Sequence, residues 1–103
     1  MEAKYADTWI MYLGIGDVMV QLGEYEQAKT YYKKYIEHQM PPRYTDSLTS
    51  IAQLCEIQGD YPGAIQAIEK ELELLASDWN TTTGETVDQL YRNISRLESK
   101  RNA

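Results

Sequence analysis

The chain has 103 residues, of which 43% are hydrophobic and 25% charged, and this composition is typical of one small folded domain. Its net charge of -6 argues against a nucleic-acid-binding protein, because contact with phosphates needs a basic surface, and the uncharged stretch Thr8–Gly16 is far too short to span a membrane. One cysteine and one histidine exclude a disulfide-stapled secreted domain and leave few ligands for zinc, so we expect no metal, no cofactor and a reducing, cytoplasmic compartment.

The first three segments with helical periodicity cover about 9–22, 25–36 and 44–57. The first ends at Gly23, which suits a left-handed C-cap, and the third ends in the same way at Gly59. The second stops before Pro41 and Pro42, where a helix cannot continue. No segment alternates with the period of two that a β-strand requires, so we expect an all-α chain.

The fourth segment begins at Asp60, a suitable N-cap, with Pro62 tolerated in the first turn. Its apolar pattern ends near Leu75 and gives way to a polar joint over about 77–84. We expect this joint to be the longest connection of the chain. We expect Trp79, within it, to fold back over the fourth and fifth helices rather than to stand exposed as an anchor for a partner.

The fifth segment starts near Thr82, where Glu85 three residues later gives the pattern of a capping box. Its apolar stripe should pack on the fourth helix and consists of Val87, Leu90, Tyr91, Ile94 and Leu97. The opposite face is polar and should close the end of the fold against water; it carries Asp88, Arg92, Arg96 and Lys100.

Two parts of the chain match each other at an offset of 36 residues, from residue 23 to residue 59. Both contain Gly, an acidic residue, Tyr, two further residues and Ala, and Gly16 aligns with Ala52 when the match is carried backward. A repeat of this length indicates helical hairpins that bury their apolar faces by stacking on their neighbours. Small residues at equivalent places would let the two helices of each hairpin approach closely.

The repeated pattern resembles the tetratricopeptide repeat over roughly residues 9–76. The first copy carries the resemblance at Tyr12, Ile15, Gly16, Gly23, Tyr25, Ala28 and Tyr32, and the second at Leu48, Ile51, Ala52, Gly59, Tyr61, Ala64 and Ile68. Tyr35 and Glu71 depart from it, because the family usually has a second Ala there. The resemblance implies an all-α fold of about five helices, with antiparallel helical hairpins stacked as a short right-handed α-solenoid.

This interpretation makes the whole of 1–103 a single domain. Repeat one would cover about 9–42 and repeat two about 43–77, followed by a joint at 78–84 and a capping helix at about 85–101.

Few residues are candidates for catalysis or metal binding. We expect His38 to be a surface residue near a helix end and Cys55 to be a small buried hydrophobic residue. Glu69, Glu71 and Glu73 should form a solvated face, because a spacing of two scatters carboxylates around a helix. We find no catalytic constellation and predict that the protein is not an enzyme.

The resemblance implies a protein-protein interaction scaffold that binds a peptide or helix through a concave surface formed by the first helix of each hairpin. Helix phase points ten residues away from the second helices: Ile10, Leu13, Asp17, Val20, Gln21, Asp46, Thr49, Gln53, Glu56 and Ile57. This surface is apolar at one end and acidic at the other, which favours a protein or peptide partner with apolar anchors and basic residues. Leu13 and Asp17 stand where one subfamily has a Lys and Asn carboxylate clamp, so that clamp is absent.

Two further expectations concern the setting. The joint and capping pattern is similar to C-terminal ends of bacterial repeat proteins, which suggests part of a larger bacterial signalling or regulatory protein. The alternative is an oligomerisation module that assembles its own parent chain, as a homo-oligomer joined through Trp9, Ile10 and Leu13.

Overall fold

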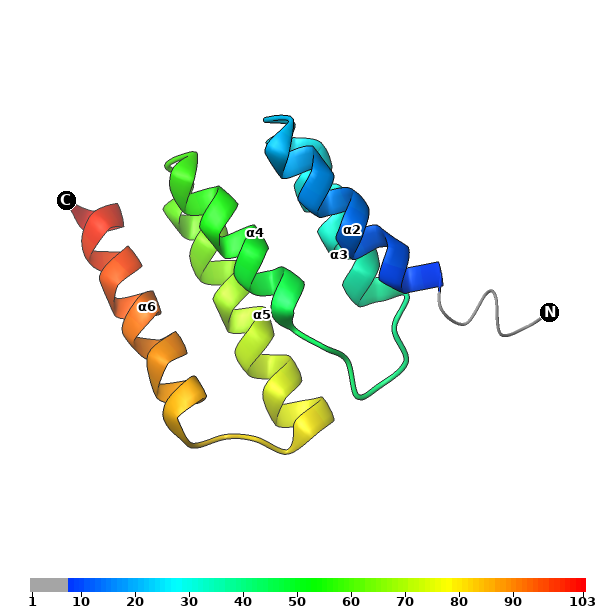
Figure 1. Cartoon of the computed structure of the whole chain (residues 1–103). Helices are drawn as coiled ribbons and strands as arrows, with labels where there is room; N and C mark the ends of the chain where they lie inside the picture. The colour runs from blue at the N-terminus through cyan, green and yellow to red at the C-terminus, as the bar shows by residue number, and fades with distance from the viewer. Residues whose placement is uncertain (1–7) are drawn as a thin grey trace.

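The computed structural model describes residues 8–103, and they form a row of five α-helices (Figure 1). The helices are α2 (Thr8–Gln21), α3 (Tyr25–Glu37), α4 (Asp46–Ile57), α5 (Tyr61–Trp79) and α6 (Glu85–Asn102). Each helix packs against the next one along the chain. The hairpins α2–α3 and α4–α5 lie side by side, with α6 at the far end of the row. The predicted all-α solenoid of stacked hairpins is confirmed.

The two hairpins turn in the same way. Gly23 and Gly59 both have φ of +78°, the left-handed conformation that glycine adopts without strain. In each turn the next amide donates to a carbonyl five residues back, from Glu24 to Met19 at 2.9 Å and from Asp60 to Cys55 at 2.8 Å. The 36-residue repeat in the sequence is therefore a repeat of backbone geometry.

Small residues lie where the helices of each hairpin cross. Gly16 is buried against the ring of Tyr32, and a Cβ built at Gly16 would lie 2.5 Å from a carbon of that ring. Ala52, at the equivalent place in the second hairpin, is 8% exposed. The expected close approach of paired helices is confirmed at Gly16, and the burial of Ala52 is consistent with it in the second hairpin.

The longest connection within residues 8–103 is 38–45, between α3 and α4, and not the joint after α5. The expectation of a long joint is wrong because α5 continues through Asp78 and Trp79 and ends only at Asn80, whose φ is +51°. The Asp78 carboxylate is bound by Arg43, which lies in the α3–α4 connection. A contact between distant parts of the sequence thus lengthens α5 beyond its apolar pattern.

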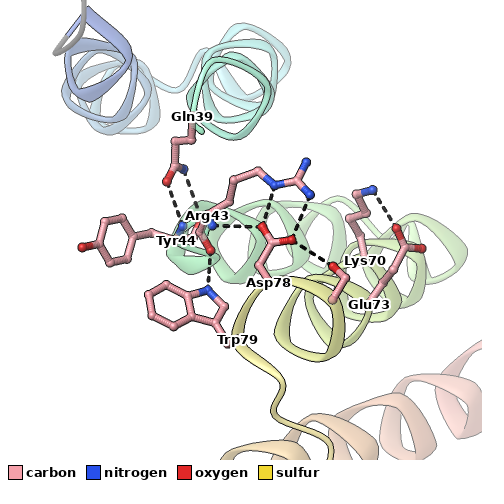
Figure 2. Close-up of polar contacts among 8 residues, drawn as sticks. Gln39, Arg43, Tyr44, Lys70, Glu73, Asp78 and Trp79 are labelled. Carbon is pink, nitrogen blue, oxygen red and sulfur yellow. Dashed lines mark hydrogen bonds and ion pairs between the residues drawn. The ribbon is translucent and has the colours of Figure 1, made fainter. Parts of the chain in front are cut away.

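Figure 2 shows how this connection is held. The Arg43 side chain donates to Asp78 through Nε at 2.7 Å and through Nη2 at 3.1 Å, and its backbone amide donates at 3.0 Å. Buried Gln39 bonds the backbone of Tyr44 twice, accepting at 2.8 Å and donating at 3.2 Å. The side chain of Trp79 donates to the Arg43 carbonyl at 2.7 Å. Trp79 therefore folds back onto the connection before α4, and the expectation that it covers α5 and α6 is corrected.

The N-termini of α5 and α6 differ. Asp60 caps α5, because its carboxylate accepts from the Gly63 amide at 3.0 Å, as predicted. The capping box expected for α6 is absent: α6 begins at Glu85, after Gly84 with φ of +114°, and Thr82 lies outside the helix. The positive φ of Gly84 makes the sharp entry that a side-chain cap would otherwise provide.

The expected exposure of two residues, Tyr91 and Glu71, is also corrected. Val87, Leu90 and Leu97 of α6 are buried as predicted, but Tyr91 is 57% exposed, because it lies a further 100° around the helix from Leu90. Glu71 of α5 is only 6% exposed and does not belong to a solvated face. None of the helices in residues 8–103 is long and apolar enough to cross a membrane.

Candidate functional site

The first helices of the two hairpins, α2 and α4, carry the ten residues predicted to form a groove. We call these ten residues the first-helix face. Its most exposed apolar members are Ile10 at 50% and Ile57 at 67%, and the neutral Gln21 and Gln53 are exposed as well. Leu13 and Val20 are half-buried and pack against the hydrophobic core.

Two members of the first-helix face reach back to the second helices. The Asp17 carboxylate accepts a hydrogen bond from the Tyr32 hydroxyl of α3, and Thr49 donates to Glu71 of α5 at 3.1 Å. The expectation that these two residues point away from the second helices is therefore wrong. Asp17 and Thr49 are short polar side chains, and they still reach the longer side chains of Tyr32 and Glu71 on the neighbouring helix.

These contacts shift the pKa values of the groups involved. Burial and then the neighbouring Asp17 raise the pKa of the Tyr32 hydroxyl. Burial raises the pKa of Glu71, while hydrogen bonds from Thr45 and Thr49 act in the opposite direction. Both groups are held inside the hairpins, so we assign them a structural role.

Asp46 lies at the start of α4, where it is exposed. Burial and then the nearby Asp46 raise the pKa of the Tyr35 hydroxyl to about 12. Asp46 is thus an accessible carboxylate beside the contact between the two hairpins.

Glu56 is bound by the last helix. Lys100 donates to its carboxylate at 2.8 Å and Arg96 at 3.0 Å, and these contacts lower the pKa of Glu56 to about 2. Arg96 and Lys100 were expected on the outer face of α6, and this expectation is corrected: only Asp88 and Arg92 of that set lack a contact with α4 among the described residues. The acidic end of the first-helix face is therefore neutralised at Glu56.

A cleft of about 400 Å³ lies on the other side of the molecule, between α3, α4 and α5, and we call it the back cleft. Its floor is apolar and includes Ile36, Ile51 and Cys55. Its rim carries both charges, with Lys33 and Glu37 from α3 and Lys70 from α5 among its residues. None of the ten residues of the first-helix face lines this cleft. The spacing of Lys29 and Lys33 beside the buried stripe of α3 is the one sequence signal that points to it.

The comparisons with known proteins match one part of the chain. A family model described as Tetratricopeptide repeat matches residues 11–37, which cover most of α2 and all of α3. The chain carries a tetratricopeptide repeat. Neither the curated proteins nor the solved structures gave a match.

The second hairpin follows the same tetratricopeptide geometry outside the matched residues. Ala64 of α5 is fully buried like Ala28 of α3, and Gly59 makes the same turn as Gly23. This agreement extends the family's architecture to α4 and α5, and α6 packs on α5 as one more helix of the stack. Tetratricopeptide repeats generally mediate contacts between proteins.

Within residues 8–103, no group of three or more His, Cys, Asp or Glu side chains could hold a metal ion. Cys55 is buried as expected, and burial raises the pKa of its thiol. His38 is exposed at the end of α3, where its Nδ1 lies 2.9 Å from the Lys34 carbonyl, also as expected.

Proposed function

We propose that this chain is a non-catalytic interaction domain that binds a segment of another protein across the first-helix face. One observation carries the proposal: Ile10 and Ile57 are 50% and 67% exposed on the first helices, although the core is complete without them. Apolar anchors of a bound helix or extended segment would cover these side chains. The match to a family of interaction repeats supports this function.

The charges narrow the partner. Asp17 and Asp46 are exposed, whereas Glu56 already has two cationic neighbours in α6. We therefore infer a partner with apolar anchors and basic residues placed opposite Asp17 or Asp46 rather than Glu56. A cytoplasmic location, a single domain over 1–103 and a place in a larger bacterial signalling or regulatory protein remain predictions.

The test uses peptides selected from a random display library against the intact chain. Binding of a selected peptide is measured by calorimetry for the wild type and for Gln53→Arg and Ile57→Asp, which change exposed side chains of the first-helix face. Gln66→Arg, on the exposed side of α5, is the matched control. We expect weaker binding for the two first-helix variants and unchanged binding for the control. Equal binding by all four proteins, or weakening confined to Gln66→Arg, would contradict the proposal.

A second candidate function is assembly of the parent chain. Self-association is favoured by exposed apolar side chains of α2, such as Met11 and Val18, and not by Trp9 and Leu13. Trp9 is half-buried and packs on Tyr35 with ring centroids 5.4 Å apart, so it is not the exposed anchor that the sequence suggested.

A further inference from the structure

A second surface of α2 is apolar and exposed. Met11, Val18 and Leu22 are 63%, 53% and 66% exposed, and half-buried Ile15 lies among them. These residues recur at i, i+4, i+7 and i+11, so Met11, Ile15 and Val18 share one side of the helix with Gly14. Leu22 lies in the turn directly after α2 and continues this side, because its amide still donates to the Val18 carbonyl at 3.1 Å. We call the five residues the α2 outer face. It carries no charge and does not overlap the first-helix face.

The two ends of the helix row differ in the polarity of their outward surfaces. In Figure 1 the hairpin α2–α3 and the helix α6 lie at opposite ends of the row. The outward side of α6 is polar, with Asp88, Arg92, Ser95 and Ser99 all exposed. A stack of helices needs a polar outer side at each end unless something covers it. Among the described residues, the outward side of α6 is polar and the α2 outer face is apolar, so the α2 outer face gains more from being covered.

The charges beside the α2 outer face suit a second copy of the chain. Glu24 is exposed at one end of α3, and within residues 8–103 its carboxylate has no ion-pair partner. Lys34 is near the other end of α3, where its Nζ lies 5.7 Å from the Tyr12 ring centre and 5.3 Å from that of Tyr31. If two copies meet in antiparallel fashion, Lys34 of each copy lies opposite Glu24 of the other. An uncharged face also lets chains of net charge -6 meet with little repulsion.

We propose that two copies of this chain pair about a two-fold axis through the α2 outer face, with Gly14 near the axis. A Cβ built at Gly14 meets nothing within 4 Å in the single chain, so its bare backbone is available for a close helix crossing. The polar outer side of α6 is a poor match for the apolar α2 outer face, which disfavours head-to-tail stacking. The pair has self-complementary geometry, in which the same patch is used by both subunits.

Pairing through this face leaves both first-helix faces free. The dimer would present two equivalent binding surfaces, and a partner with two binding segments would gain avidity from their linkage. This inference goes beyond the proposed function and stands without it, because dimer mass is measured in the absence of any peptide.

Sedimentation velocity at several concentrations tests the proposal with the whole chain. We expect a monomer-dimer equilibrium for the wild type and for the control Gln66→Glu, which places the same charge on the exposed side of α5. Val18→Glu should raise the dissociation constant by about tenfold or more, because two carboxylates would meet at an apolar contact. Circular dichroism checks that the variants keep their helix content. A wild type that stays monomeric, a growing series of larger assemblies, or a dimer unaffected by Val18→Glu would overturn the proposal.

A charge exchange tests the two-fold arrangement itself. Glu24→Lys and Lys34→Glu should each weaken the dimer, because each opposes like charges across the axis, and the double variant should recover dimerisation. A double variant weaker than both single variants would overturn the antiparallel pairing. As a measurement independent of these charges, Gly14→Cys should cross-link two copies under mild oxidation, whereas Gln53→Cys should not. The reverse pattern of cross-linking would equally contradict the proposed axis.

Discussion

Single residues decide how closely α2 and α3 approach. Gly16 has no room for a side chain, because its Cβ position is filled by the buried ring of Tyr32, whose hydroxyl is held by Asp17. Gly14, two residues earlier on the same helix, faces open space. Substitution by Ala at both glycines therefore distinguishes two effects: at Gly16 it tests packing against Tyr32, and at Gly14 it tests helix propensity alone.

We predict that Gly16→Ala lowers the free energy of unfolding by about 1–3 kcal/mol, because an added methyl group overpacks the contact with Tyr32. Gly14→Ala should raise it by about 0.5–1 kcal/mol through reduced flexibility of the unfolded chain. Urea denaturation at low protein concentration measures both. Equal effects of the two substitutions would show that the crossing is looser than described.

The pKa of Glu56 predicts a pH dependence. Contacts with Arg96 and Lys100 lower this pKa from 4.5 to about 2, so the folded chain binds a proton less readily than the unfolded chain. Their contribution to stability is present above about pH 4.5 and is lost as the pH falls toward about 2.

We expect Glu56→Gln to reduce the loss of stability of the wild type over this acidic range. The effect should be on the order of 1 kcal/mol or less, because the Glu56 side chain is 25% exposed and its pairs with Arg96 and Lys100 are screened, and added salt should reduce it. Thermal unfolding at a series of pH values measures it. Parallel pH profiles for the two proteins would show that the contact does not persist in solution.

At the scale of the helices, the connection between α3 and α4 is fixed by α5. Arg43, Asp78 and Trp79 form one hydrogen-bonded group that ties the connection to the end of α5 (Figure 2). The Asp78 side chain is only 5% exposed, whereas the Lys70–Glu73 pair drawn beside it is exposed at both partners. The first pair joins two elements and the second lies within one helix.

We predict that Arg43→Ala and Asp78→Ala each lower the thermal unfolding midpoint, and that the double variant is little worse than either, because both remove the same interaction. Lys70→Ala and Glu73→Ala are the matched controls and should leave the midpoint nearly unchanged. Additive losses at Arg43 and Asp78 would mean that the two side chains act separately.

The helices themselves could be predicted from sequence because each has apolar residues at helical spacing, and α2 to α5 are each followed by a glycine, a proline or a polar joint. Their ends could be predicted only where the signal is local, as with Asp60 at the start of α5. The end of α5 depends on Arg43, and the burial of Glu71 depends on hydroxyl groups of α4. Such contacts join residues far apart in the sequence and leave no periodic pattern.

Of the ten residues that helix phase selected on α2 and α4, Ile10 and Ile57 are exposed, whereas Leu13 and Val20 pack on the core. That the ten residues form a binding surface stays a prediction. Helix phase did not predict that Arg96 and Lys100 donate hydrogen bonds to Glu56, because the rotation of α6 about its own axis is set by packing on α5. The back cleft was missed for a similar reason, since it exists only once the two hairpins are stacked.

At the scale of the whole molecule, the stack offers two unlike surfaces to a partner. One is the first-helix face on α2 and α4, and the other is the back cleft between α3, α4 and α5. Hydrogen exchange followed by mass spectrometry, with and without a library-selected peptide, distinguishes them most directly. We predict slower exchange in residues 8–21 and 46–57 and unchanged exchange in residues 25–37. Protection centred on residues 25–37 and 61–79, with residues 8–21 unchanged, would contradict binding across the first helices.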